Sequence, residues 1–155
     1  MCKGFRSHTT GLYITRNDIF SHAMFIIGER RDSTESITRL RLFADEINPD
    51  LAIFAVLTPL PGTRVYDEAL RNGWIEDRNW AHYDMMHAIM PTQHLSRLQV
   101  QEELYNSYRS FYGSFSRRFK GIFSTNALTR HTYRYLAGQG LMKAFKDLFR
   151  SAPHA

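Results

Sequence analysis

The sequence has 155 residues, of which 43% are hydrophobic and 23% are charged; this composition is that of a folded globular protein and excludes a disordered chain. Its longest apolar run, 51–57, is too short to span a membrane, and the first residues lack the apolar stretch of a secretory signal, so a cytoplasmic location is expected. The net charge of +5 is concentrated from Arg97 onward, where ten Lys and Arg accompany three Asp and Glu. These cations are scattered, which favours a solvated helical face over a dedicated anion-binding surface.

Residues 1–22 show no clear hydrophobic pattern and are expected to form an irregular N-terminal segment. The apolar run 23–27 ends at Gly28 and is typical of a strand buried on both faces of a parallel sheet. Asp32 and Glu35 then have the spacing of a helical capping box. An amphipathic helix is expected to follow, with its apolar stripe formed by Ile37, Leu40, Phe43, Ala44 and Ile47.

A second buried strand is predicted at 51–57, after a break at 48–50. A strand–helix–strand unit requires parallel strands and a right-handed crossover. The segment 58–63 contains two prolines and a glycine, which indicate a tight, pre-organised loop. A short helix at about 65–72 is expected to end at Gly73.

Residues 74–95 are rich in Trp, Tyr, His and Met and are expected to be irregular. Ser96 and Gln99 form another capping-box pattern, which predicts the start of a long helix. The apolar stripe of this helix is expected to comprise Val100, Leu104, Tyr108, Phe111 and Phe115. Gly121 should interrupt it, and a further helical segment is predicted at about 129–149.

The sequence therefore predicts an α/β chain, in which a βαβ unit precedes a basic, aromatic-rich helical extension. Two strands are too few to form a stable sheet covered on both faces. This shortfall indicates that the α/β part belongs to a larger structure.

Two consecutive motifs resemble the late part of the barrel of radical S-adenosylmethionine (SAM) enzymes. The stretch 25–36 resembles a strand followed by Gly-x-Pro-x-Glu-Thr, with Asp32 and Ser33 at the Glu-Thr positions and Arg30 in place of the proline. The stretch 48–66 resembles the next strand and its Pro-Gly-Thr loop. The family's Gly and Ile further along also recur, at Gly73 and Ile75.

A third motif is similar to the cobalamin-binding branch of that family, the group of the anaerobic magnesium-protoporphyrin IX monomethyl ester cyclase and several methyltransferases. Its members carry Trp-x-x-Tyr-Asp-x-x-His after the barrel, which matches Trp80, Tyr83, Asp84 and His87. The resemblance covers about residues 19–120. It implies that 1–22 is an irregular remnant, that 23–75 is the last βαβ part of a partial TIM-type barrel, and that 76–155 is the helical extension.

The resemblance implies three cofactors in the intact parent enzyme: SAM, a [4Fe–4S] cluster and cobalamin. The family holds its cluster with three cysteines in a C-x-x-x-C-x-x-C motif. This sequence has only Cys2, and it contains no cobalamin-binding domain. We therefore expect the chain to be inactive alone and to require the N-terminal remainder of the same enzyme, missing or separately encoded. No metal ligand is assigned within it.

The resemblance also suggests two cofactor-binding segments. Gly28 and Glu29 would pass near the methionine or ribose part of SAM; the structural alternative is a simple turn glycine. The loop 58–63 would bound the adenine pocket, and its structural alternative is a rigid connector. The residues of this loop assigned to the cofactor are Thr58, Pro59, Pro61, Gly62 and Thr63.

Tyr83, Asp84 and His87 are the candidate catalytic residues. Tyr83 and His87 are four residues apart and would share one face of a helix. An imidazole beside a carboxylate can act as a general acid or base, or as an axial metal ligand. The structural alternative is an aromatic patch that packs the extension onto the barrel, with His87 as a structural hydrogen-bonding residue. Met85, Met86 and Met90 are expected to be packing residues rather than sulfur ligands.

The leading hypothesis is thus a C-terminal fragment of a radical SAM enzyme whose intact parent performs methyl transfer or oxidative cyclisation at an unactivated carbon of a small-molecule or protein substrate. The alternative is a stand-alone interaction module that binds an acidic protein or RNA through its basic helices. Tyr105, Tyr108 and Tyr112 lie among arginines and could stack on bases. Their helical spacing favours a buried stripe instead, so nucleic acid is the less favoured partner; Arg117, Arg118 and Lys120 remain candidates for an anionic contact.

Overall fold

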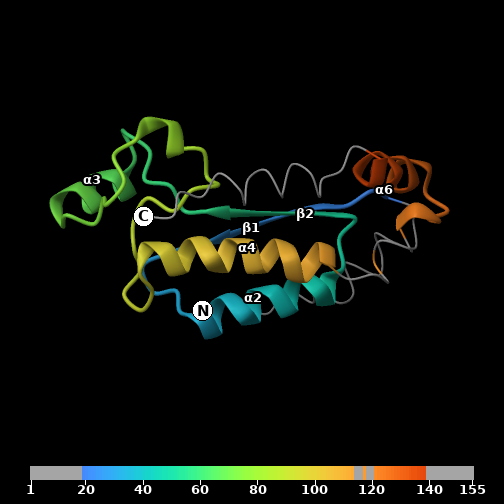
Figure 1. Cartoon of the computed structure of the whole chain (residues 1–155), viewed down its shortest axis with the longest axis horizontal. Helices are drawn as coiled ribbons and strands as arrows, with labels where there is room; N and C mark the ends of the chain where they lie inside the picture. The colour runs from blue at the N-terminus through green and yellow to red at the C-terminus, as the bar shows by residue number, and fades with distance from the viewer. Residues whose placement is uncertain (1–18, 114–116, 118–120, 139–155) are drawn as a thin grey trace.

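The computed structural model describes residues 19–113, 117 and 121–138 (Figure 1). Most of the predicted irregular segment, Phe115, Arg118, Lys120 and the predicted helical tract beyond 138 lie outside these residues. The elements are, in order, β1 (His22–Ile27), α2 (Thr34–Ile47), β2 (Leu51–Val56), α3 (Arg64–Arg71), a 3₁₀ turn (Trp80–His82), α4 (Arg97–Gly113) and α6 (Ala127–Gly138).

The two strands form a parallel pair in which His22 lies opposite Leu51 and Ile27 lies opposite Val56. Helix α2 connects them, so the predicted α/β class and βαβ unit are confirmed. In a parallel pair both carboxyl ends lie at the same edge of the sheet. Figure 1 shows this edge beside α3, while α6 lies near the opposite ends of the strands.

Helix α2 begins one residue later than the capping-box prediction required. Its N-cap is Ser33, and Ser33 and Ser36 form the reciprocal capping box. Asp32 does not cap the helix, because its carboxylate accepts hydrogen bonds from the amides of Gly28 and Glu29. The helix ends at Asn48, whose left-handed φ of 46° terminates it at the predicted place.

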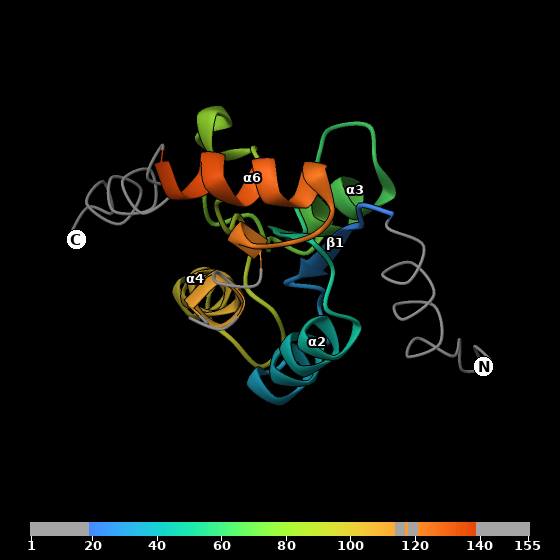
Figure 2. The same cartoon turned by 90° about the vertical axis from the view of Figure 1, so that its right-hand side faces the viewer.

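The core lies between the sheet and one layer of helices, α2 and α4 (Figure 2). Phe25 and Phe54, which are cross-strand partners, stack with ring centroids 5.2 Å apart. Phe111 packs edge-on against Phe54 with centroids 6.1 Å apart, and Tyr108 is also buried. The aromatic stripe of α4 is therefore core, as the buried-stripe interpretation predicted, and these rings are not presented for stacking on bases.

The other face of the sheet is only partly covered. Figures 1 and 2 place α6 on this side, toward the amino ends of the strands. On β1, Met24 is 61% exposed and Ile26 is 57% exposed. The prediction that β1 is buried on both faces is thus wrong for this chain, because α2 and α4 both cover the same face.

Two tyrosines of α4 occupy the outer edge of β2. The Tyr108 hydroxyl accepts from the amide of Phe54 at 3.2 Å and donates to the carbonyl of Phe54 at 2.8 Å. The Tyr112 hydroxyl does the same at Ala52, at 3.0 Å and 2.7 Å. Four residues of helix rise by roughly 6 Å, and two residues of strand by roughly 6.6 Å. The two hydroxyls therefore reach alternate residues of β2.

Several local predictions are confirmed. Gly73 has a positive φ of 65° just after α3, and Ser96 and Gln99 form the capping box of α4. The N-cap of α3 is Thr63, a role that the sequence did not predict. Arg117 contacts residues of the same chain: its guanidinium lies 3.8 Å from the ring centroid of Phe111 and 2.9 Å from a carboxylate oxygen of Asp45.

Within the described residues, no helix has the length and apolar character needed to cross a membrane.

Candidate functional site

The parallel pair brings three segments to the carboxyl edge of the sheet. Gly28 and Glu29 directly follow β1, and the loop from Thr58 directly follows β2. The third segment is attached by the last amide of β2, at Val56, which donates to the carbonyl of Met85 at 2.8 Å. The predicted cofactor-binding segments and the predicted catalytic segment therefore share one edge, where α/β barrels place their ligands.

Gly28 is required by both backbone conformation and packing. Its φ is +84°, and an added Cβ would lie 3.1 Å from Val56 and 3.2 Å from Val100. The amides of Gly28 and Glu29 donate to one oxygen of Asp32 at 2.9 Å and 3.0 Å. The close approach at Gly28 is thus to side chains of the core, and Glu29 is the exposed residue of the pair.

Arg30 fastens this loop to the segment that follows α3. It donates to the carbonyl of Pro91 at 2.6 Å, and its guanidinium lies 4.1 Å from the ring centroid of Trp74. The amide of Gln93 donates back to the carbonyl of Arg30 at 2.8 Å. At the position where the resembling family has proline, this chain therefore has a side chain that links the loop to its neighbour.

The loop 58–63 is fixed at both ends. Thr58 donates to the carbonyl of Val56 at 3.2 Å, and Pro59 is fully buried. Thr63 donates to the carbonyl of Leu60 at 2.7 Å and accepts from the amide of Tyr66 at 3.2 Å. Pro61, Gly62 and Thr63 are exposed. A loop held in this way can serve both as a connector and as the wall of a pocket.

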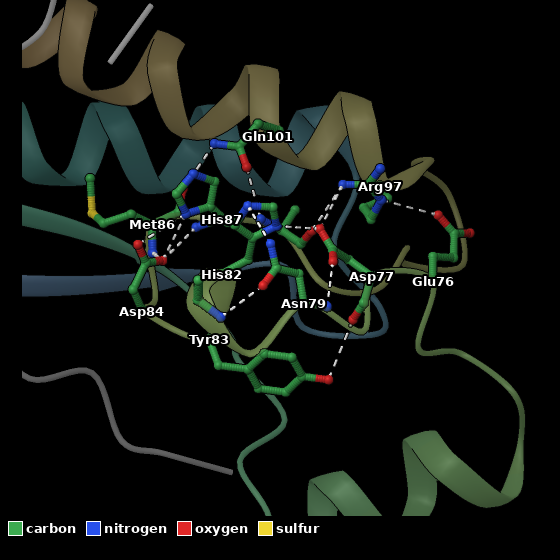
Figure 3. Close-up of polar contacts among 12 residues, drawn as sticks. Glu76, Asp77, Asn79, His82, Tyr83, Asp84, Met86, His87, Arg97 and Gln101 are labelled. Atoms are coloured by element: carbon green, nitrogen blue, oxygen red, sulfur yellow. Dashed lines mark hydrogen bonds and ion pairs between the residues drawn. The ribbon is translucent and has the colours of Figure 1, made fainter. Parts of the chain in front are cut away.

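Asp84 and His87 form a carboxylate–imidazole pair (Figure 3). The Nδ1 atom of His87 lies 2.9 Å from Oδ2 of Asp84. Oδ1 of Asp84 accepts from the amides of Met86 and His87 at 2.8 Å and 3.1 Å. The pair is therefore created by a turn rather than by helical spacing, and Met85 inside this turn has a positive φ of 64°.

Tyr83 does not join this pair. The segment is a 3₁₀ turn followed by turns, so Tyr83 and His87 do not share a helix face as the spacing suggested. The Tyr83 hydroxyl donates to the carbonyl of Asp77 at 3.4 Å, and its ring packs on Trp80 at 4.7 Å between centroids. Figure 3 shows it directed away from His87.

A second carboxylate–imidazole pair lies beside the first. The Nδ1 atom of His82 is 2.7 Å from Oδ2 of Asp77, and the His82 and His87 rings stack at 4.6 Å. The Nε2 atom of His82 lies 3.3 Å from the side-chain amide of Asn79. Sequence reasoning missed Asp77 and His82, because their spacing of five fits neither helix nor strand; only the Asp-x-Asn turn pattern hinted that the chain bends there.

Both carboxyl groups of these pairs are ionised at neutral pH. Burial acts to raise the pKa of Asp84, but hydrogen bonds from the His87 side chain and the Met86 amide outweigh it, so the pKa is lowered. Burial likewise opposes the lowered pKa of Asp77, which results from hydrogen bonds with Asn79 and His82. An ionised carboxylate at Nδ1 favours the tautomer that carries its proton there.

This arrangement leaves the Nε2 atom of His87 as the available proton acceptor. His82 uses both ring nitrogens, whereas no contact from any described residue is recorded at Nε2 of His87. Tyr83 is not a comparable acid, because burial raises its pKa further above the ordinary phenol range. His87 is therefore the member of the cluster that can exchange a proton with a bound group.

Helix α4 anchors the two carboxylate–imidazole pairs. Its first residue, Arg97, lies 3.5 Å from a carboxylate oxygen of Glu76 and 3.8 Å from one of Asp77. One turn later Gln101 donates to the carbonyl of Met86 at 2.9 Å and accepts from the amide of Ala88 at 2.8 Å (Figure 3). The turn that contains Asp84 and His87 is thus fixed to a helix of the core.

The described residues contain no group of three or more His, Cys, Asp or Glu side chains arranged to hold a metal ion. A [4Fe–4S] cluster of the kind expected from the motifs needs three thiolates, and the sequence has one cysteine. The donor set of this chain does not fit that cluster.

No protein-family model matches the chain. Curated relatives do match it, over about 60% of its length. It is 33% identical over 93 residues to an uncharacterized methyltransferase of Pyrococcus horikoshii, covering 59% of this chain and 20% of that protein. It is 33% identical over 95 residues to the anaerobic magnesium-protoporphyrin IX monomethyl ester cyclase of Cereibacter sphaeroides, covering 61% and 15% respectively.

A third relative is the bacteriochlorophyllide d C-8(2)-methyltransferase of Chlorobaculum tepidum, which is 29% identical over 102 residues, covering 66% of this chain and 21% of that protein. The resemblance to the cobalamin-dependent radical SAM group is confirmed. The chain spans about one fifth or less of the length of these relatives. The activity of a whole enzyme is therefore a matter of proposal.

Proposed function

We propose that this chain is the C-terminal part of a cobalamin-dependent radical SAM enzyme. In this proposal residues 23–75 are the last βαβ part of its barrel, 76–155 are a helical extension, and 1–22 belong to the preceding part. The intact enzyme performs methyl transfer or oxidative cyclisation at an unactivated carbon. The observation that carries the proposal is the meeting of two strand-end loops and the Asp84–His87 pair at one sheet edge, in a chain related to such enzymes.

The layering of the chain supports the barrel assignment. In α/β barrels the helices cover the outer face of the sheet and the inner face lines the interior. Here α2 and α4 cover one face, and Met24 and Ile26 are exposed on the other. In the proposed barrel these two side chains would point inward.

The loops at the carboxyl edge supply the wall of the SAM pocket in this proposal. Glu29 and the Pro61, Gly62 and Thr63 part of the 58–63 loop are exposed, and in this proposal they would contact SAM. The amides of Gly28 and Glu29 are already bonded to Asp32, so the first loop would act through the Glu29 side chain or through carbonyl groups. In this proposal Thr58 and Pro59 fix the position of the second loop and do not form part of its exposed surface.

His87 acts in this proposal as a proton acceptor at the same edge. Asp84 holds the proton on Nδ1 and leaves Nε2 to receive one from a bound substrate. His82 stacks on the ring and is a positioning residue. The cobalamin and the cluster that supplies the electron for SAM cleavage would be held by the remainder of the enzyme, and SAM would bind between that remainder and the loops of this chain.

The proposal is tested first on the isolated chain. The purified polypeptide is supplied with iron, sulfide, a reductant and SAM, and 5′-deoxyadenosine is measured. We expect none, because the chain cannot supply three thiolates. Cleavage of SAM by the chain alone would overturn the proposal.

The second test uses the chain joined to a cysteine-bearing remainder encoded beside it. His87→Gln and Asp84→Asn should each lower turnover by about 10²–10⁴-fold, the usual contribution of a general base. The matched control is His94→Gln, because it makes the same substitution at a histidine that is exposed and outside the Asp84–His87 turn. Equal turnover in the His87→Gln and His94→Gln enzymes would refute the role of His87.

A further inference from the structure

One face of α4 forms hydrogen bonds with the backbone of β2 and of the segment beyond it. The hydroxyls of Tyr112 and Tyr108 bond the backbone groups of Ala52 and Phe54. Gln101 precedes Tyr108 by seven residues, a spacing that places both side chains on the same helix face. The side chain of Gln101 therefore meets the backbone that follows the end of β2.

The carboxamide of Gln101 bonds the peptide groups on both sides of His87 (Figure 3). Its Nε2 atom donates to the carbonyl of Met86 at 2.9 Å, and its Oε1 atom accepts from the amide of Ala88 at 2.8 Å. A carboxamide offers the same donor and acceptor as a peptide group. Gln101 thus holds residues 86–88 in the way that a neighbouring strand would.

The carboxylate of Asp84 has a different effect on His87. It bonds the Nδ1 atom and the amide of His87 and the amide of Met86, all within one turn. These bonds set the shape of the turn and the tautomer of the ring. They would move together with the turn, so they do not fix where the ring lies relative to the rest of the chain.

The turn is attached to other elements through three residues. The amide of Val56 donates to the carbonyl of Met85, and Arg97 donates to the carbonyl of Ala88 at 3.4 Å. Gln101 contributes the two shorter bonds described above, one on each side of the histidine. It is therefore the side chain best placed to fix the position of the ring.

We propose that Gln101 is a positioning residue for His87, which keeps the imidazole stacked on His82 and so fixes the location of its Nε2 atom. The use of that atom as a proton acceptor rests on the proposed function, whereas the position of the ring does not. Arg97, one turn earlier on α4, acts on the other pair, because it lies 3.8 Å from a carboxylate oxygen of Asp77.

Nuclear magnetic resonance of the isolated chain tests the position of the ring. Gln101→Met keeps an unbranched side chain but removes the donor and the acceptor. The nuclear Overhauser effect between the His82 and His87 rings, which stack at 4.6 Å in the wild type, should be lost in this variant. The nitrogen shifts of neutral His87 should still report a proton on Nδ1, because the bond to Asp84 lies within the turn.

Two results would overturn the inference. A ring-to-ring signal that persists in Gln101→Met would mean that other contacts position His87. Loss of the Nδ1 tautomer in the same variant would mean that Gln101 builds the turn and does not merely position it. If circular dichroism shows that Gln101→Met is unfolded, Gln101→Glu takes its place, since it keeps an acceptor for Ala88 and loses only the donor to Met86; the same two results apply.

Gln99→Met is the matched control. It makes the same substitution on the same helix and also removes hydrogen bonds to backbone and side chain, since Oε1 of Gln99 accepts from the amide and the hydroxyl of Ser96. These bonds are exposed and cap α4, so the variant should lower the urea midpoint and retain the ring-to-ring signal. Loss of the signal in Gln99→Met would attribute the effect to helix stability and refute the specific role of Gln101.

Turnover of the chain joined to its cysteine-bearing remainder tests the use of this position. Gln101→Met should lower kcat by up to about a hundredfold and change KM much less, because a small displacement of a reacting group is sufficient for such a loss. Gln99→Met should retain the wild-type kcat. If kcat is equal in the two variants although the signal is lost in Gln101→Met, the proton-accepting role of His87 in the proposed function fails and the positioning stands. If the signal persists in Gln101→Met, the positioning fails and the proposed function stands.

Discussion

The guanidinium of Arg30 stacks on the indole of Trp74 at 4.1 Å and so joins the loop after β1 to the segment after α3. The same guanidinium donates to the carbonyl of Pro91. These two contacts connect parts of the chain that are distant in sequence, at the edge where the candidate site lies. The stability of that edge should therefore depend on this one side chain.

Arg30→Ala should lower the free energy of unfolding by about 1–3 kcal/mol, through loss of the cation–π contact and of a charged hydrogen bond. The measurement is urea denaturation followed by tryptophan fluorescence, because Trp74 reports directly on the contact. Arg31→Ala is the control, since Arg31 is an exposed neighbour in the same loop. Equal losses in the two variants would show that the stacking contributes nothing specific.

Gly28→Ala should destabilise the chain by about 2–5 kcal/mol, because it combines a left-handed backbone with crowding against Val56 and Val100. Gly62→Ala separates the two effects. Gly62 has a similar φ of +82° but nothing within 4 Å of an added Cβ, so its replacement should cost only about 1–2 kcal/mol. Thermal melting of both variants checks this order, and the reverse order would contradict the packing argument.

Tyr112 should make the fold sensitive to alkali. Burial raises the pKa of its phenol to about 12. An unfolded chain ionises this group near pH 10, so the folded state alone keeps the proton between about pH 10 and 12. Stability from this group is therefore complete below about pH 10 and is lost as the pH rises toward 12.

Tyr112→Phe should reduce that alkaline loss and should lower stability at pH 7 by about 1 kcal/mol, because the Ala52 groups lose their partner. Urea midpoints between pH 7 and 11 provide the measurement. Tyr135→Phe removes a phenol from a residue that is 59% exposed and should leave the alkaline slope unchanged. A slope that is the same in wild type and Tyr112→Phe would contradict the prediction.

Low pH should destabilise the turn that carries Asp84 and His87. The lowered pKa values of Asp84 and Asp77 mean that their ionised forms stabilise the folded state. This stability is present above the unfolded pKa of about 4 and is lost as the pH falls through the lower folded values. Asp84→Asn should therefore show a smaller loss than wild type between pH 5 and 2 in urea midpoints. Asp67→Asn on the exposed surface of α3 is the control and should behave as wild type.

Local sequence signals predicted the elements well because they depend on neighbouring residues. The capping pair Ser96 and Gln99, the stop at Gly73 and the parallel unit required by two apolar runs are examples. The shift of the first cap from Asp32 to Ser33 has a non-helical cause, since Asp32 bonds the preceding loop.

Longer-range relationships were not predictable from spacing. The hydroxyl of Tyr112 meets Ala52 at a separation of 60 residues, which no periodicity encodes. The exposure of Met24 was missed because an apolar run does not show which of its faces the rest of the chain covers. In the site, Asp84 and His87 were singled out, but the stacking of His82 on His87 arises from a turn without a regular period.

The hydrogen bond between the Val56 amide and the Met85 carbonyl has a mechanical consequence. Met85 holds an unusual backbone conformation within the turn of Asp84 and His87, so its carbonyl cannot turn away independently of that pair. Any shift of the end of β2 is thus transmitted over a few bonds to the imidazole. The end of β2 and the turn that holds the His87 imidazole are thus joined by one backbone hydrogen bond and would shift together.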